Sequence, residues 1–273
     1  MALLDATPRA DVAVLNGRIM RLVLLPVIFA VATIALWQFL CQTLHIPQIL
    51  LPTPSAIWTV LRDNYAILFS EALPTLNESL ASFAVATVLG VGIAVSLTFS
   101  AWVREAFYPG IVIFQLIPKI ALAPLFIVWL GVGETTSVVV AVFIAFFPIV
   151  VSTAIGLVGV KPEVLRLCES LTASQWQVFR MVRFPYAVPH IFAGMKVGAT
   201  MAMIGVVVGE FITAQHGLGY IIMFAAGAGE TATVLAAIVL LCAIGLGLYA
   251  IVGTAEWLVL RLYGGEMPVS GVI

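Results

Sequence analysis

The side chains of this sequence that can bind a partner are concentrated in one passage, VKPEVLRLCESLTASQWQVFRMVRFPYAVPHIFAG, which runs from Val160 to Gly194. It is the longest polar passage in a chain with only 9% charged residues. Apolar segments border it on both sides. A polar passage between two membrane segments is typical of a loop that leaves the membrane, so we expect it to contact something soluble.

Two helical halves are predicted within this passage, with a break at Thr172-Ala173-Ser174. Ser174 can cap the second half, because a serine oxygen accepts a hydrogen bond from the first amide groups of a helix. The second half is predicted to end at Phe184-Pro185, because proline disfavours the helical conformation in the residue before it. The expected arrangement is a polar helix-turn-helix.

Composition restricts the class of protein. Hydrophobic residues make up 63% of the chain, whereas soluble domains contain about half, so an all-α polytopic membrane protein is predicted. The net charge of -1 provides no basic surface for nucleic acid. Cys41, Cys168 and Cys242 are far apart, and no G-x-x-x-x-G-K-[S/T] phosphate loop is present. We therefore expect no metal, cofactor, catalytic residue or ordinary ATP site in this chain.

Six membrane-spanning helices are predicted from apolar runs of about 20 residues, the length that crosses the hydrocarbon core. The run at 20–43 is too long for a signal peptide, and no small-x-small cleavage site follows it. Thr53 and Pro54 predict the start of a helix lying in the membrane interface. In the second span, Gly90 and Gly92 should let another helix approach closely. The chain is predicted to divide into a cytoplasmic tail at 1–19, a first span at 20–43, an outer interfacial segment at 44–76, a five-helix core at 77–254 and a cytoplasmic tail at 255–273. The core contains spans at 77–99, 107–130, 136–158, 188–210 and 231–254, and the polar loop at 160–187.

Basic residues are distributed unequally between the two predicted sides of the membrane. Only Arg62 lies clearly on one side. The other side carries Arg9, Arg18, Arg21, Arg104, Lys161, Arg166, Arg180, Arg183 and Arg261. Because basic residues concentrate in cytoplasmic segments, both termini and the 160–187 loop are predicted to be cytoplasmic.

The polar loop resembles the coupling loop of ABC-importer permeases, whose pattern is roughly E-A-A, three residues, glycine, nine residues, I-x-L-P. In this chain the three positions fall on Arg166-Leu167-Cys168, Thr172 and Val182-Arg183-Phe184-Pro185. The spacing matches, whereas the leading glutamate and the glycine are replaced. Leu51-Pro52-Thr53-Pro54 also resembles the family.

Further motifs are similar to the nitrate/sulfonate/taurine branch of these permeases, which also includes carriers of thiamine-precursor pyrimidines. They are the runs PKIALAP from Pro118, WLGVG from Trp129, Phe147-Pro148, and GLGY from Gly217 after Glu210. The resemblance covers about 45–255 and implies the type I ABC importer permease fold.

The resemblance also implies partners and a location. Two ATP-binding subunits would bind the cytoplasmic loops and hydrolyse ATP, and a periplasmic or lipid-anchored binding protein would deliver a small solute. One chain carries half of such a pathway, so a homodimer is the default. The chain would then be a multi-pass protein of the bacterial cytoplasmic (inner) membrane, surrounded by lipid.

Within the loop we expect a docking knuckle at Leu171, Thr172, Ala173, Ser174 and Trp176. Small residues at the turn allow close approach, and the tryptophan can fill a pocket as an interface anchor. The alternative for Trp176 is an aromatic residue at the lipid headgroups. The remaining candidate coupling residues are Glu169, Phe184 and Pro185.

Lys119 and Glu210 are the main candidates for the translocation pathway or gate, together with Gly217 and Gly219. Lys119 lies about 20 Å into its predicted span, where a charge usually faces a cavity or a partner. It either holds an anionic solute, or snorkels to a surface because Pro118 breaks the helix. Glu210 either pairs with Lys119 of its own or the second copy, serves an outer gate, or faces water at the interface. Lys196 is predicted to snorkel to the cytoplasmic headgroups.

Two other classes of function remain as alternatives. A self-sufficient secondary transporter or channel should show internal repeats and several buried ionisable residues, whereas the sequence shows no clear repeat and only Lys119 deep in a span. A membrane enzyme would need a catalytic constellation, which Ser152 and the histidines do not clearly supply. The permease interpretation alone explains why the charges gather in one loop.

Overall fold

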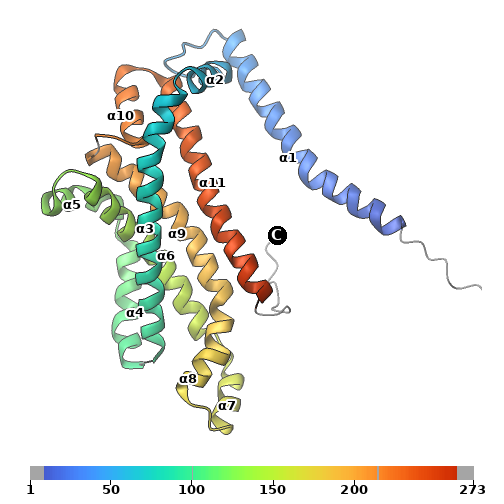
Figure 1. Ribbon diagram of the computed structural model, residues 1–273, viewed down its shortest axis with the longest axis vertical. Coiled ribbons are helices and arrows are strands. Elements are labelled where there is room, and N and C mark those ends of the chain that lie inside the picture. The colour runs from blue at the N-terminus through green and yellow to red at the C-terminus, as the bar shows by residue number, and fades with distance from the viewer. Residues whose placement is uncertain (1–8, 100, 214, 263–273) are drawn as a thin grey trace, which may run out of the picture.

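The computed structural model describes residues 9–99, 101–213 and 215–262, and every regular element within these ranges is a helix (Figure 1). The all-helical prediction is therefore confirmed. The elements are α1 (Arg9–Thr43), α2 (Pro54–Asp63), α3 (Tyr65–Phe99), α4 (Ala101–Leu116), the 3-10 turn η1 (Lys119–Leu122), α5 (Ala123–Leu130), α6 (Glu134–Val158), α7 (Pro162–Ser170), α8 (Gln175–Val178), the π turn η2 (Phe179–Arg183), α9 (Phe184–Thr213), α10 (Leu218–Ala228) and α11 (Thr231–Leu262).

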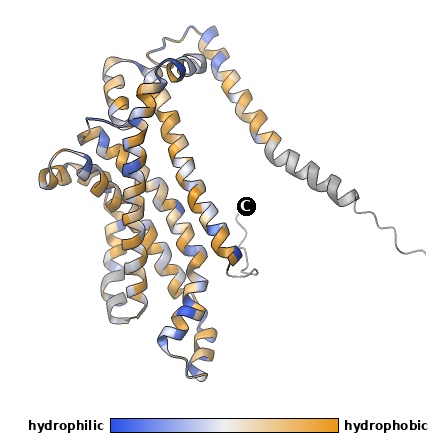
Figure 2. Ribbon diagram, viewed as in Figure 1, coloured by the Kyte–Doolittle hydropathy of each residue, from blue (hydrophilic) through white to orange (hydrophobic). Residues whose placement is uncertain are grey.

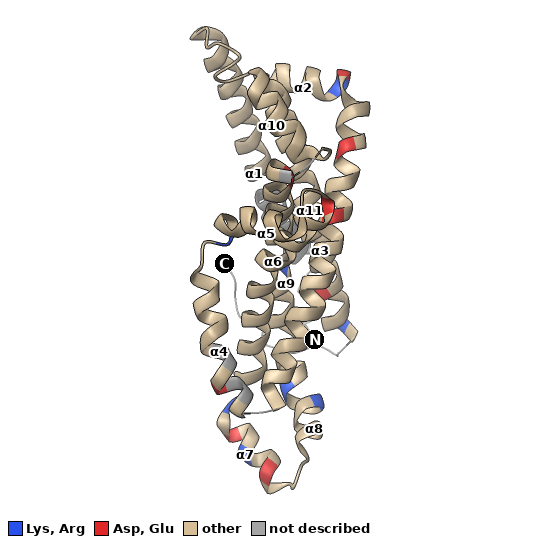
Figure 3. Ribbon diagram, turned by 90° about the vertical axis from the view of Figure 1, so that its left-hand side faces the viewer, with Lys and Arg blue, Asp and Glu red and all other residues tan. Residues whose placement is uncertain are grey.

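Within the described ranges, five helices are long and apolar enough to cross a membrane, and a sixth span is counted if one bent pair forms a single span. That pair, Pro109–Leu116 and Lys119–Leu130, bends by 83°. Apolar residues run along the helices (Figure 2), and the charged residues lie mainly toward the two ends of the bundle (Figure 3). Six spans agree with the prediction, but the third is broken, because proline cannot donate the helical hydrogen bond at Pro118.

Several helices extend beyond their predicted limits. The interfacial helix appears as α2, and Thr53 caps it by accepting a hydrogen bond from the Ala56 amide at 3.2 Å. However, α3 begins at Tyr65 rather than at 77, because its first turns pack against α2 and α10 through the buried Leu68. Helices also enter both predicted tails: α1 begins at Arg9 and α11 continues to Leu262, while residues 1–8 and 263–273 lie outside the described part of the chain.

Helix α6 forms the centre of the bundle and packs between α3 and α9 (Figure 1). Small residues on α9 make its contact with α6 unusually close: a Cβ atom added to Gly205 would lie 2.5 Å from the Ala141 Cα, and one added to Gly209 would lie 2.5 Å from the Ser137 Cα. Small residues at such spacing let membrane helices approach until their backbones touch. Helices α3, α6 and α9 therefore form the closely packed centre of the bundle.

The predicted role of the two glycines in α3 is half correct. A Cβ atom on Gly90 would lie 2.9 Å from Ile149 Cγ2, so this glycine allows the close approach of α6. A Cβ atom on Gly92 would meet nothing within 4 Å. The prediction for Gly92 was wrong, because it lies on the exposed side of the helix.

Helix α1 stands apart from the bundle (Figure 1). Only 6% of its apolar window is buried. It is attached near its C-terminal end, where Gln38 of α1 accepts a hydrogen bond from the Ser55 amide and donates one to the Ser55 hydroxyl, both at 3.1 Å. These bonds fix the end of α1 to α2 and leave most of α1 uncovered.

Candidate functional site

The polar loop forms one end of the molecule, where α7 and α8 project beyond the spans (Figure 1). Helix α7 ends at Ser170, and α8 begins at Gln175. The predicted helix-turn-helix and its break at 172–174 are confirmed. We call residues 171–176 the knuckle, and we call this end of the molecule the loop end.

The turn between α7 and α8 is a Schellman motif, in which two amide groups beyond the helix bond back to carbonyl groups of its last turn. The Ala173 amide donates to the Cys168 carbonyl at 3.0 Å, and the Thr172 amide donates to the Glu169 carbonyl at 2.9 Å. Such a turn requires a left-handed residue, and Thr172 has a φ of 56°. Thr172 stands at the position where the coupling-loop pattern has glycine, so the structure shows why glycine suits that position.

Replacing Thr172 with glycine is expected to stabilise the protein by up to about 1 kcal/mol, because a left-handed conformation strains a β-branched residue but not glycine. The thermal unfolding temperature of the purified chain in detergent should rise. As a matched control, Thr254→Gly in the exposed part of α11 should lower it, since glycine inside a helix costs about 1 kcal/mol. A fall for Thr172→Gly would contradict the assignment of strain to this residue.

The second half of the loop starts as predicted. The Ser174 hydroxyl accepts a hydrogen bond from the Gln177 amide at 3.3 Å, and the Gln177 side chain accepts one from the Ser174 amide at 2.8 Å. This reciprocal pair is a capping box, which satisfies two amide groups at the start of a helix. Ser174 therefore fixes the direction in which α8 leaves the knuckle.

The prediction that this helix ends at Phe184-Pro185 was wrong. The chain continues from Gln175 to Ile212 without interruption. Proline lacks an amide hydrogen, and its ring would collide with the carbonyl four residues earlier in an α-helix. The helix avoids this conflict by widening into the π turn η2, in which the Phe184 amide donates to the Phe179 carbonyl.

Beside the knuckle, a cavity of about 490 Å³ opens between the loop and the end of α3. Glu169 and Ala173 of the predicted set line it, and Phe99 and Arg183 form further parts of its wall. The cavity therefore combines charged and aromatic walls at the loop end.

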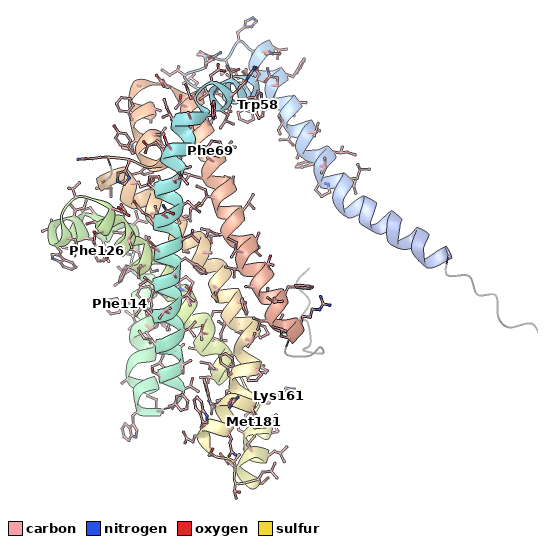
Figure 4. All side chains as sticks on the ribbon, viewed as in Figure 1. Trp58, Phe69, Phe114, Phe126, Lys161 and Met181 are labelled. Carbon is pink, nitrogen blue, oxygen red and sulfur yellow. The ribbon has the colours of Figure 1, made fainter. Side chains whose placement is uncertain are left out.

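The knuckle carries two exposed apolar side chains. Leu171 is 70% exposed and Trp176 is 60% exposed. Figure 4 marks Met181 and Lys161 at the same end of the molecule. The Trp176 ring is stacked on Phe179, with ring centroids 5.5 Å apart, so it is held in place although it is exposed. Leu171 and Trp176 therefore form a small exposed apolar surface on the knuckle.

Two predicted coupling residues lie away from this surface. Phe184 packs against Phe179, with ring centroids 5.9 Å apart, and joins the buried clusters at the base of the loop. Pro185 lies in the first turn of α9. Both residues shape the connection between the loop and α9.

Lys119 lies at the break of the third span rather than deep in a straight helix. Its amine donates to the Gln115 carbonyl at 3.1 Å and lies 5.1 Å from the centroid of the Phe147 ring. Among the described residues no carboxylate pairs with Lys119. The helix is broken at Pro118, as one of the two alternatives for Lys119 predicted, whereas the option of pairing with Glu210 of the same chain was wrong.

Glu210 is 1% exposed, so the prediction of a carboxylate facing water was wrong. Its Oε1 accepts a hydrogen bond from the Thr75 hydroxyl at 2.6 Å, and its Oε2 accepts one from the Gly219 amide at 2.7 Å. The partners come from α3 and from the start of α10. Glu210 therefore joins three helices at the end of the bundle opposite the knuckle.

Two further bonds complete this arrangement. The Thr75 hydroxyl accepts a hydrogen bond from the Leu218 amide at 2.9 Å, and Glu71 Oε2 accepts one from the Gly217 amide at 2.6 Å. Three successive amide groups at the start of α10 are thus bound by side chains from α3 and α9. Carboxylates suit this position because the first amides of a helix carry partial positive charge.

The predicted Gly217 and Gly219 are brought together with Glu210 for a steric reason. Gly217 has a φ of 100°, a conformation that favours glycine. A Cβ atom on Gly219 would lie 2.7 Å from both Glu210 Cβ and Oε2, and one on Gly217 would overlap the same carboxylate. Glycine at both positions lets the carboxylate reach the amide groups.

Sequence reasoning missed Glu78 of α3, which is 2% exposed and whose Oε2 has no hydrogen-bond partner in the described structure. It lies within electrostatic reach of Glu210 and Glu134. A buried carboxyl group with an oxygen that lacks a hydrogen-bond partner is a candidate functional group, because burying an unsatisfied polar atom is costly. The sequence offered little indication of Glu78, because a membrane span was predicted to begin at 77 and a glutamate at the end of a span is not unusual.

Lys196 of α9 has a carboxylate partner. Its amine forms an ion pair with Glu256 of α11 at 2.5 Å and lies 5.7 Å from the Tyr249 ring centroid. The ion pair was not predicted, because Glu256 was assigned to the cytoplasmic tail, and the direction of Lys196 toward the cytoplasmic headgroups stays a prediction. This pair fastens α11 to α9.

Comparison with known proteins gives one family for most of the chain. The family described as "Binding-protein-dependent transport system inner membrane component" matches residues 86–256. The chain is 32% identical to the riboflavin transport system permease protein RibX of Chloroflexus aurantiacus over 229 residues, 82% of this chain and 85% of the relative. It is 33% identical to the formylaminopyrimidine transport permease protein ThiX of Halalkalibacterium halodurans over 198 residues, 71% of this chain and 78% of the relative.

Two further matches extend this similarity. The putative aliphatic sulfonates transport permease protein SsuC of Bacillus subtilis is 30% identical over 216 residues, 78% of each chain. Among solved structures, a chain of the MetNI methionine ABC transporter in an inward-facing conformation gives a TM-score of 0.61 at 19% identity, covering 74% of this chain and 99% of that chain. At that identity, the likeness concerns the fold.

Proposed function

This chain belongs to the family of binding-protein-dependent transport system inner membrane components, the permease subunits of ABC importers, and from this premise we propose that two copies line the path of a small solute. The homodimer is the default because one chain contains one set of spans, and closed two-fold symmetry is the commonest assembly. We further propose that each copy binds one ATP-binding subunit, and that ATP is hydrolysed there and not in this chain.

The observation that carries the proposal is the knuckle with its adjoining cavity. A Schellman turn and a capping box fix the backbone of 171–176, and exposed apolar side chains project from it. Exposed apolar patches with polar surroundings are typical of protein-binding surfaces. We propose that the knuckle enters the ATP-binding subunit, with Leu171 and Trp176 as anchors and Glu169 at the edge of the cavity.

The positive-inside distribution supports a location in the bacterial cytoplasmic membrane with the loop end in the cytoplasm. The α10 end then faces the outside, where a binding protein would deliver the solute. Relatives carry names that refer to riboflavin, formylaminopyrimidine, aliphatic sulfonates, taurine and nitrate. We propose a small solute within this range and no cofactor in the permease itself.

A mild-detergent pull-down of the tagged chain from its native membrane tests this proposal. Copurification of an ATP-binding subunit, with ATP hydrolysis in the isolated complex, is the expected result. A chain that emerges without an ATP-binding subunit and carries proton- or sodium-driven flux by itself would support the secondary-transporter alternative.

Replacing Lys119 with methionine is expected to lower solute uptake at least tenfold without loss of the ATP-binding subunit. The reason is that an amine with no carboxylate partner, beside the Phe147 ring, is available to a negatively charged group of the solute. Uptake by whole cells is measured with nitrate, ethanesulfonate and taurine, each of which carries a negatively charged group, and the solute that the native protein imports is then used for the variants. Lys119→Arg, which keeps the charge, should retain more uptake. Equal losses of uptake and of subunit association in Lys119→Met would indicate a structural role instead.

A further inference from the structure

One continuous helical segment joins the two ends of the molecule. Helix α8, the π turn and α9 run from Gln175 to Ile212, a stretch of 38 residues, or about 57 Å at 1.5 Å per residue. It begins within the knuckle and ends beside α10 (Figure 1). Close contact with α6 along its length makes this segment stiff. The segment therefore forms a continuous helical connection between the knuckle and the α10 end.

The far end of this segment carries Glu210, which holds the start of α10. We call Glu71, Thr75, Glu210 and the amide groups of 217–219 the α10 clasp. Its four hydrogen bonds measure 2.6 to 2.9 Å. Thr75 is its centre, because its hydroxyl accepts from Leu218 and donates to Glu210. The clasp therefore joins α10 to α9 and α3 at once.

Helix α10 is short and only partly buried. The helix has 11 residues, too few to cross a membrane. Leu218 and Ile222 on one side are buried in a cluster with residues of α2, α3 and α11, whereas Phe224 on the other side is 70% exposed. Short, partly exposed elements are the ones that move most easily. The clasp is thus the hydrogen-bonded connection between a stiff helix and a short one.

We propose that the α10 clasp couples the two ends of the transporter, with Thr75, Glu210 and Glu71 as positioning residues. Movement of α9 that starts at the ATP-binding subunit is passed through Glu210 to α10 at the outer side. In the opposite direction, docking of the binding protein near α10 is passed to the ATP-binding subunit. This inference rests on the function proposed above, and it adds residues that lie far from the knuckle.

Replacing Thr75 with valine tests the clasp, because valine has nearly the same shape and lacks the hydroxyl. The substitution leaves the Leu218 amide without its acceptor. It also removes the Thr75 hydroxyl as a donor to Glu210, whereas the Gly219 amide remains. The experiment uses the purified complex of permease, ATP-binding subunit and binding protein in proteoliposomes. ATP hydrolysis is measured with and without the binding protein, whose stimulation of hydrolysis reports the coupling.

We expect Thr75→Val to retain the ATP-binding subunit and its basal hydrolysis rate while its stimulation falls about tenfold, as befits the loss of buried charge-assisted bonds. Thr75→Ser, which keeps the hydroxyl, should behave as the native protein does. Glu71→Ala at the half-buried edge of the clasp should lose part of the stimulation. Glu230→Gln, a substitution of an exposed carboxylate that follows α10, is the matched control and should change nothing.

Native stimulation in both Thr75→Val and Glu71→Ala would overturn the proposal. Loss of the ATP-binding subunit in these two variants would also overturn it, since the clasp would then serve folding alone. A native complex that lacks an ATP-binding subunit would instead refute the importer function itself, and this outcome is visible before any variant is made.

Discussion

Replacing Gly205 with leucine is expected to abolish the accumulation of folded protein in the membrane. A Cβ atom at this position would lie 2.5 Å from the Ala141 Cα, so the obstacle is backbone and cannot rotate away. Inserting carbon atoms into a well-packed core costs about 1–3 kcal/mol even where side chains can adjust. At this contact α9 would have to separate from α6, the central helix of the bundle.

The measurement is the yield of monodisperse protein after extraction in mild detergent, followed by size-exclusion chromatography. Gly92→Leu is the matched control, because a Cβ atom on Gly92 meets nothing within 4 Å and the helix there is exposed. It should give a near-native yield. A normal yield of the Gly205→Leu variant would show that α6 and α9 are not in backbone contact.

Replacing Ala173 with arginine is expected to reduce copurification of the ATP-binding subunit at least tenfold and to stop solute uptake, while the permease itself stays folded. Ala173 is half-buried at the wall of the cavity beside the knuckle. A guanidinium group there would lie close to the existing Arg183 of the same wall and would fill space that a docking partner needs. Blocking the centre of an interface commonly costs more than 2 kcal/mol.

Ala173→Ser is the control, because it adds one oxygen without a charge or a long side chain. This variant should retain the ATP-binding subunit. Both variants should elute from size-exclusion chromatography as the native protein does. Unchanged copurification and uptake in Ala173→Arg would remove the knuckle from the docking site.

The local part of the structure was predictable from the sequence. The cap at Ser174 and the helix start at Thr53 are confirmed, and the break at Pro118 agrees with one of the two alternatives for Lys119, because each depends on residues within a few positions of one another. The type I permease fold and the family are confirmed as well. The family motifs are spread over most of the chain, so the family can be identified although Thr172 replaces the glycine of the coupling-loop pattern.

The distant contacts were not predictable in the same way. Glu210 meets Thr75, which lies 135 positions earlier in the chain, and no periodic pattern indicates that pairing. The ion pair between Lys196 and Glu256 was not predicted either, because Glu256 was assigned to a tail and not to the membrane helix that packs beside Lys196. Helix limits failed where packing outside the membrane extends a helix, as at Tyr65.

The π turn has a consequence for how the loop is aimed. A π turn contains one more residue than an α-helical turn, and one residue of an α-helix corresponds to a rotation of about 100°. The direction in which the knuckle points around the axis of α9 therefore depends on the one extra residue of the π turn at 179–183. In a chain of the same fold without that residue, the knuckle would face a different side of the bundle. The length of this short stretch therefore determines the side on which a partner can contact the knuckle.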